Sequence, residues 1–258
     1  MIRHLHCLGT AGYHPNDERH TSCYFVPEAG LVLDAGSGLF RLSPLIQTDH
    51  LDIVLSHAHL DHIAGLTFLL DVLYQRPVDQ VRIWGESEKL QAIQEHLFSR
   101  LIFPVELDVR WCEIDGRRSL TLDRCEMFWR AQEHPGGSLG YRIDWPDGDS
   151  WLYLTDTTGD DSSEAIEFYR DAQLMMHECY FRSEHESFAR KTGHTWTDRL
   201  VSIAKAAKPK RLLLTHVNPL DTAPERMLDE VKAGLDDEPI TIELASDGLM
   251  IRPDSAAE

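Results

Sequence analysis

The sequence contains no apolar run approaching the roughly 18 residues that a membrane-spanning helix needs. Its first residues, Met1 to His6, also lack the apolar core of a signal peptide. These two absences argue against a membrane partner and against secretion. We therefore expect a cytoplasmic protein.

Cysteine is scarce and unpaired in pattern. The five cysteines are odd in number and scattered, and no two of them form a C-x-x-C pair. This arrangement excludes a disulfide framework and a cysteine-based zinc site.

Several common catalytic motifs are also missing. There is no P-loop and no G-x-G-x-x-G, and the chain has no G-x-S-x-G nucleophile elbow. These absences exclude kinases, dinucleotide enzymes and serine hydrolases of the elbow type.

Basic residues are few, and the formal net charge is −18. A surface this acidic repels a phosphate backbone unless cations gather locally. The best cluster, Lys205, Lys208, Lys210 and Arg211, is more simply a solvated helix end and loop. The charge therefore disfavours nucleic acid as a partner but permits a small anionic substrate beside metal ions.

The chain reads as two successive strand-rich halves, each with its own helices, which favours two packed sheets with helices outside. With 258 residues and no evident linker, we expect one domain over residues 1–258. Helical patterns are predicted at 63–74, 86–100, 162–169, 195–207 and 224–235, and a closing hairpin at 240–244 and 249–251.

A dense group of metal-ligand side chains follows the apolar strand 53–56. His57-Ala58-His59-Leu60-Asp61-His62 places four such side chains within six residues, just before a predicted helix. Side chains two apart share one face of an extended backbone, so His57 and His59 can turn to the same side. Imidazole and carboxylate together suit zinc, manganese or iron.

Three further ligand types each follow an apolar run, where a metal site would draw its remaining ligands. They are His134, Asp156 and His216. Loop geometry alone can expose any one of them, but the three together with the His57–His62 motif favour a metal site.

Short motifs along most of the chain resemble the metallo-β-lactamase fold superfamily, specifically its RNase Z-like and cyclic phosphodiesterase branch. The matching segments are Leu8-Gly9-Thr10, Leu33-Asp34-Ala35-Gly36, Ser56 to His62, His134 with Gly140-Tyr141-Arg142, Leu154-Thr155-Asp156-Thr157, His177-Glu178-Cys179-Tyr180-Phe181, Gly193-His194-Thr195 and Leu214-Thr215-His216.

The resemblance implies an α/β fold, a four-layer αββα sandwich in which two mixed β-sheets lie face to face with helices outside. It also implies two divalent metal ions, zinc first, with manganese or iron(II) as alternatives. His57, His59 and His134 would hold one ion, and Asp61, His62 and His216 the other. Asp156 would bridge both ions, and Asp34 would fix a ligand or a loop by hydrogen bonds.

The catalytic roles follow from the same resemblance. A metal-bound hydroxide would attack phosphorus, oriented by Asp61. His194 would protonate the leaving oxygen. A hydrogen bond from His194 to Glu178 would hold it in the donating state, since a neighbouring carboxylate raises the pKa of an imidazole. We interpret His177 as structural.

One departure from the branch concerns its substrate. RNase Z enzymes carry a long tRNA-gripping arm between the third and fourth metal motifs, whereas His134 and Asp156 are 22 residues apart here. This favours a small or cyclic phosphodiester substrate. The alternatives are a tRNA 3′-processing endonuclease, a lactone or thioester hydrolase of the same fold, and a metal-binding protein without catalysis.

The resemblance also suggests a homodimer. His14 and His20 lie in an early loop where they could touch substrate, although a solvated loop is the simpler interpretation.

Overall fold

The computed structural model describes residues 3–252, and within this range the chain forms two compact units. The N-terminal unit comprises residues 3–120 and the returning segment Ser246–Arg252. The C-terminal unit comprises Thr121–Ala245. The single domain expected over residues 1–258 stays a prediction.

The N-terminal unit is built on a mixed seven-stranded sheet with the order β14-β1-β2-β3-β4-β5-β6. The β3–β4, β4–β5 and β5–β6 pairs are parallel, and the pairs from β14 to β3 are antiparallel. Its strands are β1 (Leu5–Gly9), β2 (Cys23–Val26), β3 (Leu31–Leu33), β4 (His50–Val54), β5 (Gln80–Gly85), β6 (Arg110–Glu113) and β14 (Met250–Ile251).

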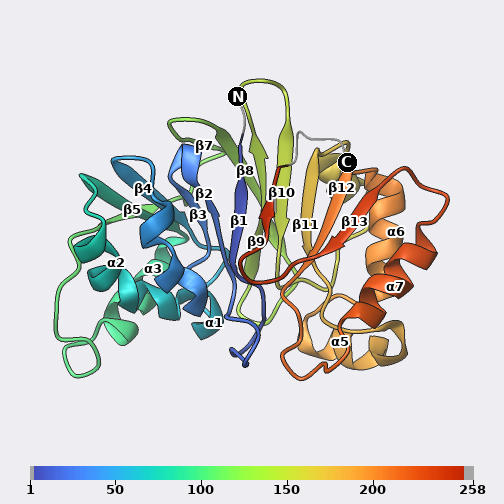
Figure 1. The fold of residues 1–258 in the computed structure, drawn as a ribbon, viewed down its shortest axis with the longest axis horizontal. Helices are drawn as coiled ribbons and strands as arrows, with labels where there is room; N and C mark the ends of the chain where they lie inside the picture. The colour runs from blue at the N-terminus through green and yellow to red at the C-terminus, as the bar shows by residue number, and fades with distance from the viewer. Residues whose placement is uncertain (1–2, 253–258) are drawn as a thin grey trace. The chain divides into compact units, whose positions relative to one another are not determined.

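Short helices cover this sheet and supply the apolar side chains that fill its core (Figure 1). Leu66, Leu69 and Val72 from these helices are buried with Ile53 and Ile83 from the strands. The helical elements are η1 (Pro27–Ala29), η2 (Ser37–Arg41), η3 (Ser43–Leu45), α1 (Leu60–Ile63), η4 (Ala64–Phe68), α2 (Leu69–Gln75), α3 (Ser87–Ala92) and the π-helical turn η5 (Ile93–Leu97).

The C-terminal unit carries a second mixed seven-stranded sheet, ordered β13-β12-β11-β10-β9-β8-β7. Strands β10 to β13 run parallel, whereas β8, β9 and β10 pair antiparallel. Its strands are β7 (Leu120–Thr121), β8 (Glu126–Gln132), β9 (Ser138–Asp144), β10 (Ser150–Leu154), β11 (Leu174–Glu178), β12 (Arg211–Thr215) and β13 (Thr241–Leu244).

Helices α6 and α7 lie against this second sheet (Figure 1), and apolar side chains of α4, α6 and α7 are buried together with those of its strands. Leu200 and Ile203 of α6 are fully buried, as is Val231 of α7. The helices are α4 (Ser163–Tyr169), η6 (Ser183–His185), α5 (Glu186–Thr192), α6 (Thr197–Ala207) and α7 (Glu225–Gly234).

The two mixed sheets with helices confirm the predicted fold class. The expected closing hairpin is wrong, because β13 pairs with β12 in one sheet and β14 pairs with β1 in the other. All five cysteines are buried and free. In residues 3–252 no helix combines the length and apolarity needed to cross a bilayer.

Candidate active site

Parallel strands bring four ligand-type side chains to one edge of the N-terminal sheet. We call these residues, His57, His59, Asp61 and His62, the first donor set. Asp34 follows β3 directly, and His57 lies just after its parallel neighbour β4. Because the carboxyl ends of parallel strands meet at one edge, this is the usual place for a site in an α/β sheet. The loop after β4 then enters α1, which contains Asp61 and His62.

The three histidines of this loop lie with their rings against each other. The ring centroid of His57 is 4.4 Å from that of His59 and 4.3 Å from that of His62. His57 and His62 are buried, whereas His59 is exposed. The three histidines of the His57–His62 motif therefore lie close together within the N-terminal unit.

The Asp34 carboxylate determines which ring nitrogens face the site. Its Oδ1 accepts a 2.7 Å hydrogen bond from the Ser56 amide, and its Oδ2 accepts one of 2.7 Å from the Ser56 hydroxyl. His62 Nδ1 also lies 2.7 Å from Oδ2 and must donate to it. Since Ser56 gives its proton to Asp34, His57 Nδ1 is the donor in its 3.0 Å contact with Ser56 Oγ. Both histidines therefore present the lone pair of Nε2, the form that binds metal.

Three further ligand-type side chains gather at the carboxyl edge of the C-terminal sheet. We call these residues, His134, Asp156 and His216, the second donor set. Asp156 and His216 follow the parallel strands β10 and β12, and His134 follows β8, which runs in the same direction. His134 Nε2 lies 3.3 Å from Oδ1 of Asp156, and His216 Nε2 lies 3.1 Å from Oδ2. One histidine thus stands at each oxygen of Asp156.

These contacts fit bound cations. His134 Nδ1 donates to the Gly193 carbonyl at 2.9 Å, so the nitrogen facing Asp156 carries a lone pair. Likewise His62 Nε2, with its Nδ1 proton on Asp34, lies 3.2 Å from Oδ2 of Asp61. Two acceptors this close are stable when a cation binds both, and imidazole with carboxylate is a zinc-type donor set.

A third pair, Glu178 and His194, stands beside the second set. Glu178 ends β11 and is fully buried, and its Oε2 lies 3.0 Å from His194 Nδ1. Its Oε1 accepts a 2.5 Å hydrogen bond from the Thr157 amide. Ligand atoms of Asp156, His194 and His216 lie within 4.8 Å of one another. The Glu178 carboxylate therefore fixes His194 next to Asp156 and His216.

Tyr180 covers the face of His194, a contact that the sequence did not predict. The two rings are stacked at 4.3 Å with an interplanar angle of 14°. The resembled branch has His-Glu-Ala-Thr where this chain has His177-Glu178-Cys179-Tyr180. The changed loop therefore adds a ring that restricts the orientation of His194.

His177 is fully buried, and its Nδ1 lies 2.7 Å from the Glu178 carbonyl oxygen. Burial lowers the pKa of His177.

Backbone strain marks the same positions. Asp34, Asp156 and His216 have positive φ values of 56°, 51° and 50°. Non-glycine residues rarely adopt this conformation, and it concentrates at functional sites. Asp34 and His216 directly follow strands β3 and β12, and Asp156 lies two residues after the end of β10. At each position the strained turn aims the side chain at the sheet edge.

Comparison with known proteins agrees with this geometry. Residues 31–217 match the model of the β-lactamase superfamily domain. This range contains every predicted donor. The chain belongs to the metallo-β-lactamase superfamily.

Individual relatives of this superfamily cover nearly the whole chain. A ribonuclease Z of Gemmatimonas aurantiaca is 26% identical over 82% of this chain and 84% of its own. The metallo-β-lactamase fold protein YhfI of Bacillus subtilis matches with a TM-score of 0.78, 21% identity, and 97% and 99% coverage of the two chains. The short form of human tRNase Z matches with a TM-score of 0.76, 19% identity, and 98% and 100% coverage. The chain is therefore a hydrolase of the metallo-β-lactamase fold.

Proposed function

We propose that the chain is a dinuclear metal-dependent phosphodiesterase. The observation that carries the proposal is the contact of the buried Glu178 with the half-buried His194, next to Asp156 and His216. A fixed proton donor beside metal ligands suits a reaction whose leaving group is an alkoxide. Thioester hydrolysis, one competing reaction on this fold, expels a thiolate and has less need of such a donor, whereas lactone hydrolysis is separated from phosphodiester hydrolysis by the substrate comparison below.

Side chains of the two donor sets would together hold two ions, preferably zinc, with the roles implied by the resemblance. His57, His59 and His134 would hold one ion, Asp61, His62 and His216 would hold the other, and Asp156 would contribute to both. The support is the acceptor pairs within each unit and the superfamily membership. When bound, the ions supply positive charge for the phosphate oxygens and lower the pKa of a water molecule.

The protein's own groups then handle the protons. Asp61, whose Oδ2 accepts a 2.7 Å hydrogen bond from the Tyr13 amide, orients the attacking water and receives its proton. Glu178 accepts from Nδ1 of His194, and its negative charge favours the doubly protonated imidazolium, whose Nε2 proton is then transferred to the leaving oxygen. The Tyr180 ring keeps the imidazole in this orientation.

A small or cyclic phosphodiester is the proposed substrate class. The interval between His134 and Asp156, where the RNase Z arm would lie, is occupied by strands β9 and β10 and the short turn 145–149. The net charge of −18 also disfavours long nucleic acids. Ribonuclease activity is the second candidate, favoured by the relatives named ribonuclease Z. A cytoplasmic location accompanies both.

Turnover of bis(p-nitrophenyl) phosphate by zinc- or manganese-loaded protein tests the proposal. We expect metal-dependent release of p-nitrophenolate that a chelator abolishes, and the same preparation should leave p-nitrophenyl acetate largely intact. No phosphodiester turnover by fully metallated protein would refute it. Faster ester than phosphodiester turnover would favour the lactone or thioester alternative.

A further inference from the structure

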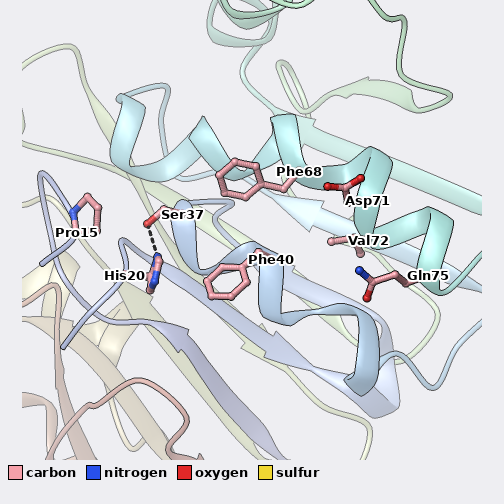
Figure 2. A pocket seen from close by; sticks show the side chains of 8 residues that line it. All are labelled: Pro15, His20, Ser37, Phe40, Phe68, Asp71, Val72 and Gln75. Atoms are coloured by element: carbon pink, nitrogen blue, oxygen red, sulfur yellow. Dashed lines mark hydrogen bonds between the residues drawn. The ribbon is translucent and has the colours of Figure 1, made fainter. Parts of the chain in front are cut away.

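A cavity of about 510 Å³ lies in the N-terminal unit between the loop before β2 and helices η2, η4 and α2. Its lining residues are Pro15, His20, Ser37, Phe40, Phe68, Asp71, Val72 and Gln75 (Figure 2). This volume falls within the range of small-molecule sites, which is about 300 to 1,000 Å³. The metal donors and the proton donor described above do not line it.

Two phenyl rings dominate the middle of the cavity. Phe40 projects from η2 and Phe68 from η4, and Figure 2 shows both rings in the gap between these helices. The Arg41 guanidinium lies over the Phe40 ring, 4.8 Å from its centroid, yet Phe40 is 49% exposed, so part of the ring remains accessible to a ligand. Exposed aromatic faces of this kind bind flat rings by stacking.

Polar groups at the α2 end have the pattern of a nucleobase edge. Asp71 and Gln75 are four residues apart and share the helix face that begins with Phe68. The Gln75 side-chain carbonyl already accepts from Ser43 Oγ at 3.1 Å, which directs its amide protons elsewhere. An acceptor, Asp71, therefore stands next to a donor, Gln75. The Asp71 charge repels phosphate, so this end suits a neutral ring with N–H donors.

At the opposite end, His20 offers one more hydrogen-bonding group. Its Nδ1 lies 3.1 Å from Ser37 Oγ, and its ring centroid is 4.8 Å from that of Phe40. Ser37 Oγ accepts from the Thr21 amide and can give its own proton to His20, which leaves an N–H at Nε2. The cavity thus has a polar group at each end and two aromatic rings between them. We call it the aromatic slot.

The slot is connected to the first donor set by short backbone contacts. The loop that provides Pro15 and His20 begins at Tyr13, whose amide donates to the Asp61 carboxylate at 2.7 Å. Gly36, just before Ser37, lies so close to α1 that a Cβ there would be 2.2 Å from the Asp61 carbonyl oxygen. Phe68 is six residues beyond His62 on continuous helical backbone, which at 1.5–2 Å per residue is about 10 Å. The cavity is therefore lined by segments that adjoin those carrying Asp61 and His62.

We propose that this cavity is a nucleobase subsite, so that the substrate is a phosphodiester of a nucleoside, with guanine as the preferred base. The inference rests on the proposed phosphodiesterase function for its catalytic part. Guanine is preferred because its N1–H and exocyclic amine form an adjacent donor pair for Asp71, while its carbonyl oxygen accepts from Gln75.

Kinetics with guanosine and uridine 2′,3′-cyclic phosphates test the subsite. Phe40→Leu and Phe68→Leu keep an apolar side chain but remove the ring, and each should raise KM for the guanosine substrate about tenfold. Phe40→Tyr should restore it. Asp71→Asn should reduce the guanosine-over-uridine preference.

The matched controls are Phe188→Leu, a phenylalanine on α5 that is 54% exposed, and Asp229→Asn, an exposed aspartate on α7. Neither should change KM or base preference. Unchanged KM in both slot phenylalanine variants would overturn the inference while leaving phosphodiesterase activity intact.

Binding of guanosine, which has no phosphate, separates this inference from the proposed function. Saturation-transfer NMR should detect guanosine on the wild type and a clear loss of signal in Phe40→Leu. If guanosine binds in this way but no phosphodiester is hydrolysed, the subsite stands and the phosphodiesterase proposal fails. If guanosine does not bind, or binds equally to Phe40→Leu, the subsite is wrong.

Discussion

At Asp34 a single buried carboxylate receives protons from the Ser56 amide, the Ser56 hydroxyl and His62. Through Ser56 it also determines which nitrogen of His57 faces the site. An amide in its place would offer one acceptor and turn donors toward Ser56 or His62. The tautomers of two ligands therefore depend on one residue.

Asp34→Asn should consequently weaken metal binding by about 10- to 100-fold, the usual cost of losing such a ligand partner. Competition titration with a zinc chelator measures the affinity, and circular dichroism checks that the variant folds. Asp229→Asn is the control. Unaltered zinc affinity in a folded Asp34→Asn protein would contradict the role given to Asp34.

His194 permits a test by leaving group. A p-nitrophenolate leaves without a proton, whereas a ribose or alkyl oxygen needs one. His194→Ala should therefore slow hydrolysis of substrates with alkoxide leaving groups by about 10²- to 10⁴-fold and barely affect bis(p-nitrophenyl) phosphate. Glu178→Gln should show the same pattern more weakly. Equal losses of kcat on both substrate types would argue that His194 is not the proton donor.

The donors could be predicted from the sequence because each follows an apolar run or belongs to the dense His57–His62 motif. Tyr180 could not, since nothing in its neighbourhood distinguishes a stacking ring from a core residue. The tautomers set by Asp34 also depend on a hydrogen bond to a residue 28 positions away. Local pattern reports which side chains can bind metal, and long-range contacts decide how they are held.

Among the structural elements, the end of α5 has a particular role. Gly193 closes this helix with φ 80°, and its carbonyl accepts from His134 Nδ1. A Cβ at this position would lie 2.4 Å from Pro135 Cδ and 3.0 Å from His134 Nδ1. The helix end therefore orients His134 and leads directly into His194.

Gly193→Ala should lower zinc affinity and activity together, because it displaces His134 as well as straining the backbone. Gly148→Ala is the matched control, since Gly148 also has a positive φ (91°) but has no atom within 4 Å of the added Cβ. Both variants should lose about 1 kcal/mol of unfolding free energy from strain. If Gly148→Ala reduced zinc binding as much as Gly193→Ala, the effect would be general instability.

Element boundaries show where local signals fail. The apolar spacing predicted one helix over 63–74, but the structure divides this stretch into α1, η4 and α2. Gly65 packs so closely on the Gly36 carbonyl oxygen that a Cβ would lie 2.1 Å away, and the chain tightens there. The predicted closing hairpin is wrong because long-range contacts hold the residues at its expected turn. Asp247, at its expected turn, binds Thr10, His20 and Arg41 of the N-terminal unit.

For the whole molecule, the excess of negative charge links metal binding to the stability of the folded state. The chain has a formal charge of −18, and each donor set adds carboxylates at a sheet edge. Cations that bind only the folded state stabilise it, by about 2.7 kcal/mol at a hundredfold excess over Kd.

Removal of metal should accordingly lower Tm by several degrees, and zinc should restore it. Differential scanning calorimetry of chelator-treated and reloaded protein measures this shift. In His62→Ala the zinc-dependent part of the shift should shrink. A Tm that does not respond to zinc in the wild type would mean that the donor sets do not bind it in the folded state.

Anomalous diffraction at the zinc edge from zinc-loaded crystals tests the central claim most directly. The account predicts two peaks, one bound by His57, His59 and His134 and the other by Asp61, His62 and His216, with Asp156 bound to both. A single peak, a peak away from these side chains, or none in protein shown to contain zinc would contradict it.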